Sequence, residues 1–205
     1  MDPYKRILAA DPQKILDLFL GHGSFILLSD KQRRRLWNRW RRIHRHPLSF
    51  QGITMKNIDR SDYQLEGAIL AEATLDGAAL NDCNLVTANL SKASAIRVDF
   101  SSADMTGANL SGANLQGADF EAAYLYKAII KKADIRGFGG SHAIFNYADL
   151  RYADFSSASS HTFINPLLSS PTSIWLVPNA RGEIYHHKPE KVLFSTSGLA
   201  TLFWI

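Results

Sequence analysis

Residues 31–46 hold the densest set of chemically active side chains in the sequence, with seven arginines and one lysine among sixteen positions. Guanidinium groups bind carboxylates and phosphates through paired hydrogen bonds. A helix here, at about 100° per residue, places apolar residues on one face and most cations on the opposite face. The apolar residues are Leu36, Trp37, Trp40 and Ile43. The candidate residues for binding an anionic partner are Lys31, Arg34, Arg35, Arg41, Arg42 and Arg45.

This basic face fits three kinds of partner: nucleic acid, an anionic membrane surface or an acidic patch on a protein. A solvated face with no partner is the alternative. The remaining reactive residue types form no catalytic or metal-binding set, because the seven histidines are scattered without a motif at metal-ligand spacing. The glycine-rich stretches 21–24 and 136–140 do not match phosphate or dinucleotide loops. We therefore predict a protein that is not an enzyme, with no catalytic residue, metal or cofactor.

A five-residue repeat predicts the framework that positions this basic segment. Between Phe50 and Phe155 every fifth residue is large and apolar, with three exceptions. The exceptions are Arg60, Ala95 and Gly140. The residue two places earlier is nearly always Ala, and Asn or Asp often lies between the two, so the consensus is Ala-(Asp/Asn)-Leu-x-x.

A period of five fits neither a helix nor a single strand, whose apolar residues recur about every 3.6 and 2 positions. Four five-residue steps that close one square coil would bury both columns and stack residues 20 apart, with parallel pairing about 4.8 Å between coils. Asn and Asp suit the corners, where their side chains hydrogen-bond the local backbone. The inward core ladder predicted from this stacking is Leu70, Leu90, Leu110, Ile130 and Leu150.

With this consensus the chain resembles the pentapeptide-repeat family over about residues 48–160. The resemblance implies an all-β solenoid, a right-handed quadrilateral parallel β-helix of about five to six turns. Residues 1–47 are then an N-terminal helical cap and residues 161–205 a short C-terminal cap or tail. The resemblance leaves the function open, because the family includes topoisomerase inhibitors, bacterial effectors and regulators of cell differentiation.

Two positions inside the repeat call for a local explanation. Cys83 is the only cysteine, so no internal disulfide can form, and its place in the Ala column predicts a buried thiol rather than a reactive one. Gly140 stands where a large residue belongs and Phe138 where Ala belongs. This exchange of sizes predicts a local bulge, with a recognition loop as the alternative.

The two ends of the chain have their own signals. Asp-Pro pairs predict helices at about residues 3–10 and 12–20, and Ser29 and Gln32 have the capping-box spacing that opens the basic helix. Pro47 stops that helix, and its tryptophan face is expected to cover the open end of the coil. Residues 173–177 and 183–187 predict a β-hairpin, and the apolar tail 199–205 predicts a cap or a homodimer contact.

Charge divides along the chain, with net +7 in residues 1–47, −4 in 48–160 and +1 in 161–205. The leading functional prediction is a non-enzymatic protein–protein interaction or regulatory scaffold module. One alternative is a DNA mimic that inhibits or protects a type II topoisomerase (gyrase), which needs an acidic rod. The other is nucleic-acid or anionic-surface binding through residues 31–46. The sequence has no signal peptide or long apolar run, which predicts a cytoplasmic location.

Overall fold

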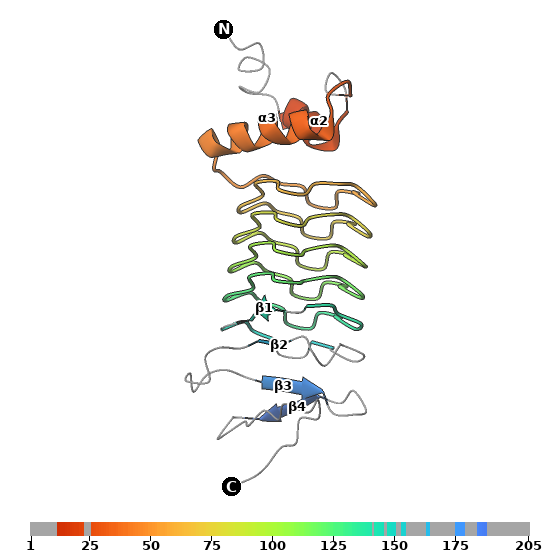
Figure 1. Ribbon diagram of the computed structural model, residues 1–205, viewed down its shortest axis with the longest axis vertical. Coiled ribbons are helices and arrows are strands. Elements are labelled where there is room, and N and C mark those ends of the chain that lie inside the picture. The colour runs from red at the N-terminus through yellow and green to blue at the C-terminus, as the bar shows by residue number, and fades with distance from the viewer. Residues whose placement is uncertain are drawn as a thin grey trace.

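The computed structural model describes residues 12–22, 26–140, 142–145, 147–150 and 153–154, and the strands at 163–164, 175–178 and 184–187. Helices α2 (Pro12–Leu20) and α3 (Asp30–Ile43) come first. The strands are β1 (Ala143–Ile144), β2 (Phe163–Ile164), β3 (Trp175–Pro178) and β4 (Ile184–His187). A stack of coils forms the body of the molecule, and both helices lie across one end of this stack (Figure 1).

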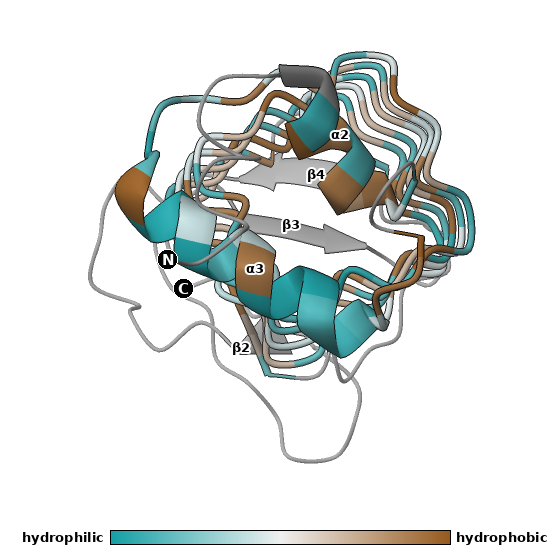
Figure 2. Cartoon of the chain, turned by 90° about the horizontal axis from the view of Figure 1, so that it is seen from above, coloured by the Kyte–Doolittle hydropathy of each residue, from teal (hydrophilic) through white to brown (hydrophobic). Residues whose placement is uncertain are grey.

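The coils are held together by parallel bridges between residues 20 apart, from Ser49↔Ile69 to Asp134↔Asp154. Each five-residue step supplies one bridge, so four steps close one coil, as the sequence period predicts. Seen from above, the successive coils superpose on one four-sided outline (Figure 2). Each wall is too short for a long strand, which is why most pairings are single bridges flanked by turns.

The interior is filled by the two apolar columns. Leu70, Leu90 and Leu110 are fully buried, Ile130 is 2% exposed, and Leu150 packs against the core while partly exposed. The backbone stacks in the same register, because Leu70 N and Leu110 N donate to Asn89 O and Ile129 O, both at 2.7 Å. The five residues of the predicted ladder therefore lie in the core or against it.

A left-handed residue turns the chain at each corner. The residue two places after each large inward position has φ between 53° and 68° throughout residues 52–147. Glycine adopts this conformation without steric cost, and at Gly77 an added Cβ would also collide with Asn57 Oδ1. The Asn and Asp side chains stabilise the same turns as predicted, since Asn89 Oδ1 accepts from Ser91 N at 3.0 Å.

The exchange of sizes at Phe138 and Gly140 produces no bulge. The bridges Asp119↔Gly139 and Tyr124↔Ile144 keep the 20-residue spacing on both sides of Gly140, so no extra residue enters the coil. Phe138 is 2% exposed and lies in the core. The predicted bulge is wrong because the side chain of Phe138 fills the space without a change in register.

The helical predictions agree with α2 and with the start of α3, whose capping box joins Ser29 and Gln32 in both directions. Helix α3 ends at Ile43, before Pro47, because His44 leaves helical geometry while its N–H still donates to Trp40 O. The predicted helix at residues 3–10 lies outside the described residues.

Beyond the coil, β3 and β4 pair in antiparallel fashion, which confirms the predicted hairpin. Strand β2 pairs with β1 in parallel, Ala143↔Phe163 and Ile144↔Ile164, so the 20-residue register continues past residue 160 although the consensus stops at Ala158. Backbone pairing therefore extends further than the side-chain pattern. The apolar tail 199–205 lies outside the described residues.

Candidate interaction surfaces

Helix α3 is fixed to the first coil by its tryptophan face. Trp37 is fully buried, and its Nε1 donates to Gln64 O at 2.9 Å. The ring of Phe19 from α2 lies 4.8 Å from the rings of both Trp37 and Phe50, so the two helices and the first coil share one aromatic cluster. This contact holds α3 in one orientation and decides which of its cations face solvent.

Arg41 was predicted on the exposed basic face, and this placement is wrong. It is 4% exposed and donates to His44 O at 2.7 Å, His46 O at 2.9 Å and Glu66 O at 2.6 Å. Four residues after Trp37, it lies only about 40° from it around the helix. Burial lowers the pKa of Arg41, but an arginine stays charged at any physiological pH.

Ile43 also departs from its predicted face, because it is 70% exposed rather than packed on the coil. Arg34 is partly exposed. Its Nη1 pairs with Asp62 Oδ2 at 2.7 Å and donates to Ser61 O at 3.2 Å. This guanidinium is therefore already engaged by the coil. The predicted binding residues that remain exposed are Lys31, Arg35, Arg42 and Arg45.

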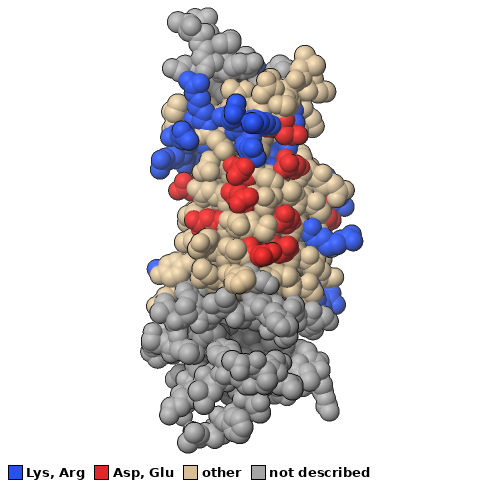
Figure 3. Space-filling model, in the orientation of Figure 1, with Lys and Arg blue, Asp and Glu red and all other residues tan. Residues whose placement is uncertain are grey.

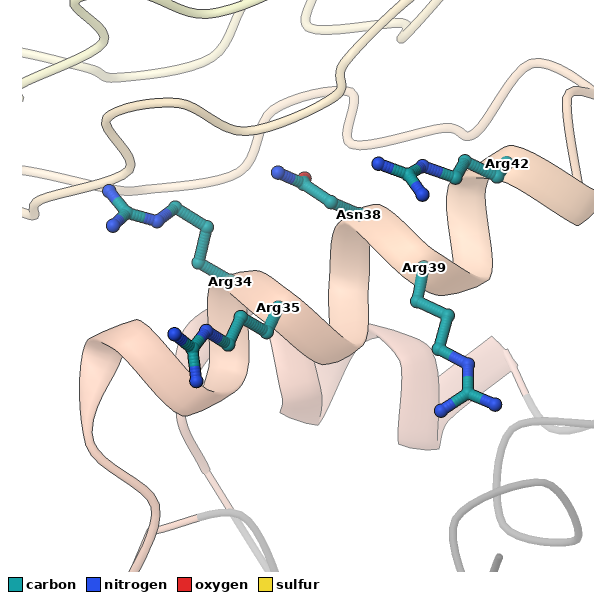
Figure 4. A pocket seen from close by; sticks show the side chains of 5 residues that line it. All are labelled: Arg34, Arg35, Asn38, Arg39 and Arg42. Atoms are coloured by element: carbon teal, nitrogen blue, oxygen red, sulfur yellow. The ribbon is translucent and has the colours of Figure 1, made fainter.

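The exposed side of α3 carries a shallow basic pocket (Figure 4). Its lining consists of Arg34, Arg35, Asn38, Arg39 and Arg42. Arg34 and Asn38 extend toward the first coil, whereas Arg39 turns away from it (Figure 4). The pocket therefore brings four guanidinium groups together along about two turns of the helix, and guanidinium groups suit an anionic partner.

Arg60 is a buried cation that the sequence marked only as a break in the apolar column. It is 2% exposed, and its guanidinium carbon lies 5.4 Å from the ring centre of Phe19 and 5.5 Å from that of Tyr63. Its Nη1 lies 3.8 Å from Asp30 Oδ1 at the start of α3. Desolvation lowers the pKa of Arg60. The residue thus joins the first coil to both helices.

One wall of the coil, which we call the acidic wall, is formed by residues 59–62, 79–82, 99–102 and 119–122. Its carboxylates are Asp59, Asp62, Asp82, Asp99, Asp119 and Glu121. Arg60, the one Lys or Arg in these four segments, is buried. Among the described residues, Asp62 is the one carboxylate of this wall that forms an ion pair, and its partner is Arg34. The wall therefore presents unneutralised negative charge.

Backbone N–H groups bind three of these carboxylates. Ser61 N donates to Asp59 Oδ1 at 2.9 Å, and this bond lowers the pKa of Asp59. Ser101 N and Glu121 N donate in the same way to Asp99 and Asp119, each at 2.9 Å. On this side of the molecule, cations gather over the helical end and carboxylates along the coils below it (Figure 3).

Two of the other walls pair their charges. Lys56 Nζ lies 3.4 Å from Asp76, Lys131 Nζ lies 3.0 Å from Asp149, and Arg136 Nη2 lies 2.7 Å from Asp134. Such exposed pairs contribute little stability. They do neutralise the surface locally, which distinguishes these walls from the acidic wall.

Cys83 is buried as predicted. Its Sγ donates to Arg60 O at 2.9 Å, and burial raises the pKa of the thiol to about 12. Within the described part of the chain, no three His, Cys, Asp or Glu side chains gather in an arrangement that could hold a metal ion. The described helices also include none with the length and apolar character needed to cross a bilayer.

Parallel coils 20 residues apart, with one large and one small inward side chain per step, define a solenoid of the β-helix class. A sequence model of the family "Pentapeptide repeats (8 copies)" matches residues 68–107 and 103–138. Residues 68–138 of this chain are pentapeptide repeats of that family. A comparison with curated protein sequences finds no match.

Solved structures of pentapeptide repeat proteins are similar to this chain. One is Rfr23 from the cyanobacterium Cyanothece 51142, 22% identical over 62% of this chain and 97% of that chain, with a TM-score of 0.45. Another, from the Arabidopsis thaliana thylakoid lumen, is 28% identical over 53% of this chain and 69% of that chain, with a TM-score of 0.36. A third is QnrB1, a plasmid-mediated fluoroquinolone resistance protein, 22% identical over 56% and 67%, with a TM-score of 0.30.

Proposed function

We propose that this chain is a non-enzymatic interaction module whose acidic wall binds a protein partner with a basic surface. The observation that carries the proposal is the separation of charge among the walls. Asp76 and Asp149, on two other walls, have cationic neighbours on adjacent coils, whereas the carboxylates of the acidic wall, apart from Asp62, have no ion pair among the described residues. A rigid, unneutralised row of like charges attracts and orients an oppositely charged partner.

The geometry of the coil supports this role. The inward positions form the core and the outward ones face solvent, so substitutions on a wall leave the core packing intact. Residues 20 apart stack in register, which places Asp99 and Asp119 on neighbouring coils about 4.8 Å apart. The spacing of the carboxylates is thus set by the backbone and not by flexible loops.

The test is capture of partners from a lysate of the source cells by the wild type and by two neutralised variants. The wall variant carries Asp82→Asn, Asp119→Asn and Glu121→Gln; the matched control carries Glu66→Gln, Glu72→Gln and Asp104→Asn, so both lose three negative charges. Asn retains the oxygen that accepts the backbone N–H at Asp119 and Asp104. A basic protein should be retained by the wild type and the control and lost by the wall variant. Equal retention by all three contradicts the proposal.

A second candidate is a DNA mimic that occupies the DNA site of a type II topoisomerase. The same wall favours it, because stacked carboxylates present a regular row of negative charge, as a phosphate backbone does. A supercoiling assay with purified gyrase separates this case from the general one. Inhibition by the wild type and the control, but not by the wall variant, identifies gyrase as the partner. An unaffected assay excludes gyrase and leaves the capture experiment to decide the general proposal.

The finer architecture belongs to this proposal as well. We infer a right-handed coil of about five to six turns, with α2 and α3 as its N-terminal cap and residues 161–205 as a short C-terminal cap. The aromatic cluster of Phe19, Trp37 and Phe50 supports the capping role, since it covers apolar groups at the end of the first coil. Homodimer formation through residues 199–205 and a cytoplasmic location remain predictions.

A further inference from the structure

The exposed large apolar residues of the described chain are unevenly distributed. The three most exposed are Leu27 at 91%, Ile43 at 70% and Ile26 at 68%. All three flank α3: Ile26 and Leu27 lie just before it, and Ile43 is its last residue. The coil buries its own aliphatic columns almost completely. Exposed aliphatic side chains are therefore concentrated at the helical end.

Exposed cations lie between and beside these aliphatic positions. Arg35 and Arg42 are exposed on α3, Arg45 follows the helix, and none of the three forms an ion pair among the described residues. The fourteen residues of α3 span about 21 Å. Aliphatic groups at both ends of this length, with arginines between them, combine the two features by which peripheral proteins bind anionic bilayers.

We propose that the helical end of the rod is a docking surface for an anionic membrane. The arginines contact lipid phosphates, and Leu27 and Ile43 enter the boundary between headgroups and acyl chains. Helix α3 itself cannot insert, because its tryptophan face is already packed against the coil. The contact is therefore superficial, reversible and weakened by salt. This inference is independent of the acidic wall, whose residues it does not use.

The aliphatic residues favour a membrane over nucleic acid. Phosphate backbones are bound by cations and hydrogen-bond donors, which need no exposed Leu or Ile beside them. An aliphatic side chain at 91% exposure is fully hydrated, and the acyl boundary of a bilayer removes it from water. The cations alone fit either partner, and the pairing with Leu27 and Ile43 selects the bilayer.

The test is co-sedimentation of the full chain with vesicles of equal parts phosphatidylcholine and phosphatidylserine, and with vesicles of phosphatidylcholine alone. Binding is expected only to the anionic vesicles and should fall as salt rises. The variant Arg35→Gln, Arg42→Gln, Arg45→Gln should weaken it by roughly a hundredfold, at about fivefold per charge. The variant Leu27→Ser, Ile43→Ser should weaken it by about tenfold or more.

Matched controls on the coil walls distinguish binding at this site from non-specific electrostatic or hydrophobic binding to vesicles. Lys92→Gln, Lys127→Gln, Lys132→Gln removes the same charge, and Ile129→Ser removes an aliphatic group from a wall; both should bind as the wild type does. All variants should melt at the wild-type temperature. Absence of binding to anionic vesicles overturns the proposal, and so does equal loss in the wall controls.

A nucleic-acid arm completes the test, with duplex and single-stranded DNA at the same phosphate concentration as the vesicles. Tighter binding to DNA than to vesicles overturns the membrane proposal. Vesicle binding that is insensitive to Leu27→Ser, Ile43→Ser also overturns it, because the aliphatic contact is then absent.

Discussion

The ring of Phe138 lies 5.1 Å from the ring of Phe120, in the interior of the coil. Phe120 is itself 5.1 Å from Phe100, one coil away, so Phe138 continues a stack of aromatic rings. The residue 20 places after Phe120 is Gly140, which has no side chain to offer. Phe138 therefore supplies from the small-residue column the ring that the large-residue column lacks.

This relationship predicts a compensating pair. Phe138→Ala should lower the free energy of unfolding by about 3–5 kcal/mol, because it leaves a cavity beside Phe120. Adding Gly140→Leu restores the usual order of sizes and should recover most of that loss. Gly140 has no positive φ, so the backbone accepts a side chain there. Urea unfolding measures each value. A double variant no more stable than Phe138→Ala alone would show that the two positions do not share one space.

Arg41 and its neighbour Arg42 offer a matched comparison. Arg41→Ala removes donors to three carbonyl oxygens and should destabilise the helical end by about 2–4 kcal/mol. Arg42→Ala removes an exposed side chain and should change stability by about 0.5 kcal/mol or less. Unfolding followed by tryptophan fluorescence reports on Trp37 and Trp40 beside both positions. Equal losses of stability in the two variants would mean that the hydrogen bonds of Arg41 do not stabilise the helical end.

Cys83 predicts a pH dependence with a definite sign. Burial raises the pKa of its thiol from 9.0 to about 12, so the folded state keeps a proton that the unfolded state loses. Its contribution to stability is complete below pH 9 and is lost as pH rises from 9 to about 12, at about 1.4 kcal/mol per pH unit.

Cys83→Ala isolates this contribution, because Ala is the usual residue at that position and other groups also titrate above pH 9. The difference in unfolding free energy between the wild type and this variant should decline with pH over that range. A constant difference would mean that the thiol titrates normally in the folded protein. Native Cys83 should also resist alkylation at pH 8, when unfolded protein reacts.

The inward ladder predicts a further contrast between core and wall. Leu110→Ala should cost about 2–5 kcal/mol, since Leu110 is fully buried and its coil contacts coils on both sides. Ile129→Ala removes a similar volume from a side chain that is 39% exposed and should cost less than half as much. Both are measured by denaturant unfolding. Similar losses would contradict the assignment of inward and outward columns.

The fold could be predicted because the pattern is long, stays in register past its three exceptions and follows from packing. Each five-residue step of the coil has space for one large and one small inward side chain. Leu and Ala therefore recur at fixed places in every step. The left-handed corners also had a signal, the recurrent glycines such as Gly107 and Gly112, which sequence reasoning did not use. The continuation of pairing into β2 could not be inferred, because backbone hydrogen bonds do not require the consensus side chains.

The candidate surfaces were harder to predict from the sequence, for a different reason in each case. By charge Arg41 belongs with the other cations, but its angle from Trp37 places it toward the coil. Arg60 was visible as a break in a column, but its partners Phe19 and Asp30 come from a separate part of the chain. The net charge of −4 for residues 48–160 does not reveal the acidic wall, because it is the sum over four walls that differ in charge.

The closed 20-residue coil lets the length of the molecule change in fixed steps while each wall keeps its orientation. Because four steps return the chain to the same wall, a gain or loss of 20 residues changes the length by about 4.8 Å and leaves every wall facing the same way. The separation between the helical end and any partner held on the acidic wall can therefore change in equal increments without rotation of one relative to the other. Insertion of five residues would instead turn the distal part by a quarter, so that a different wall faces the partner.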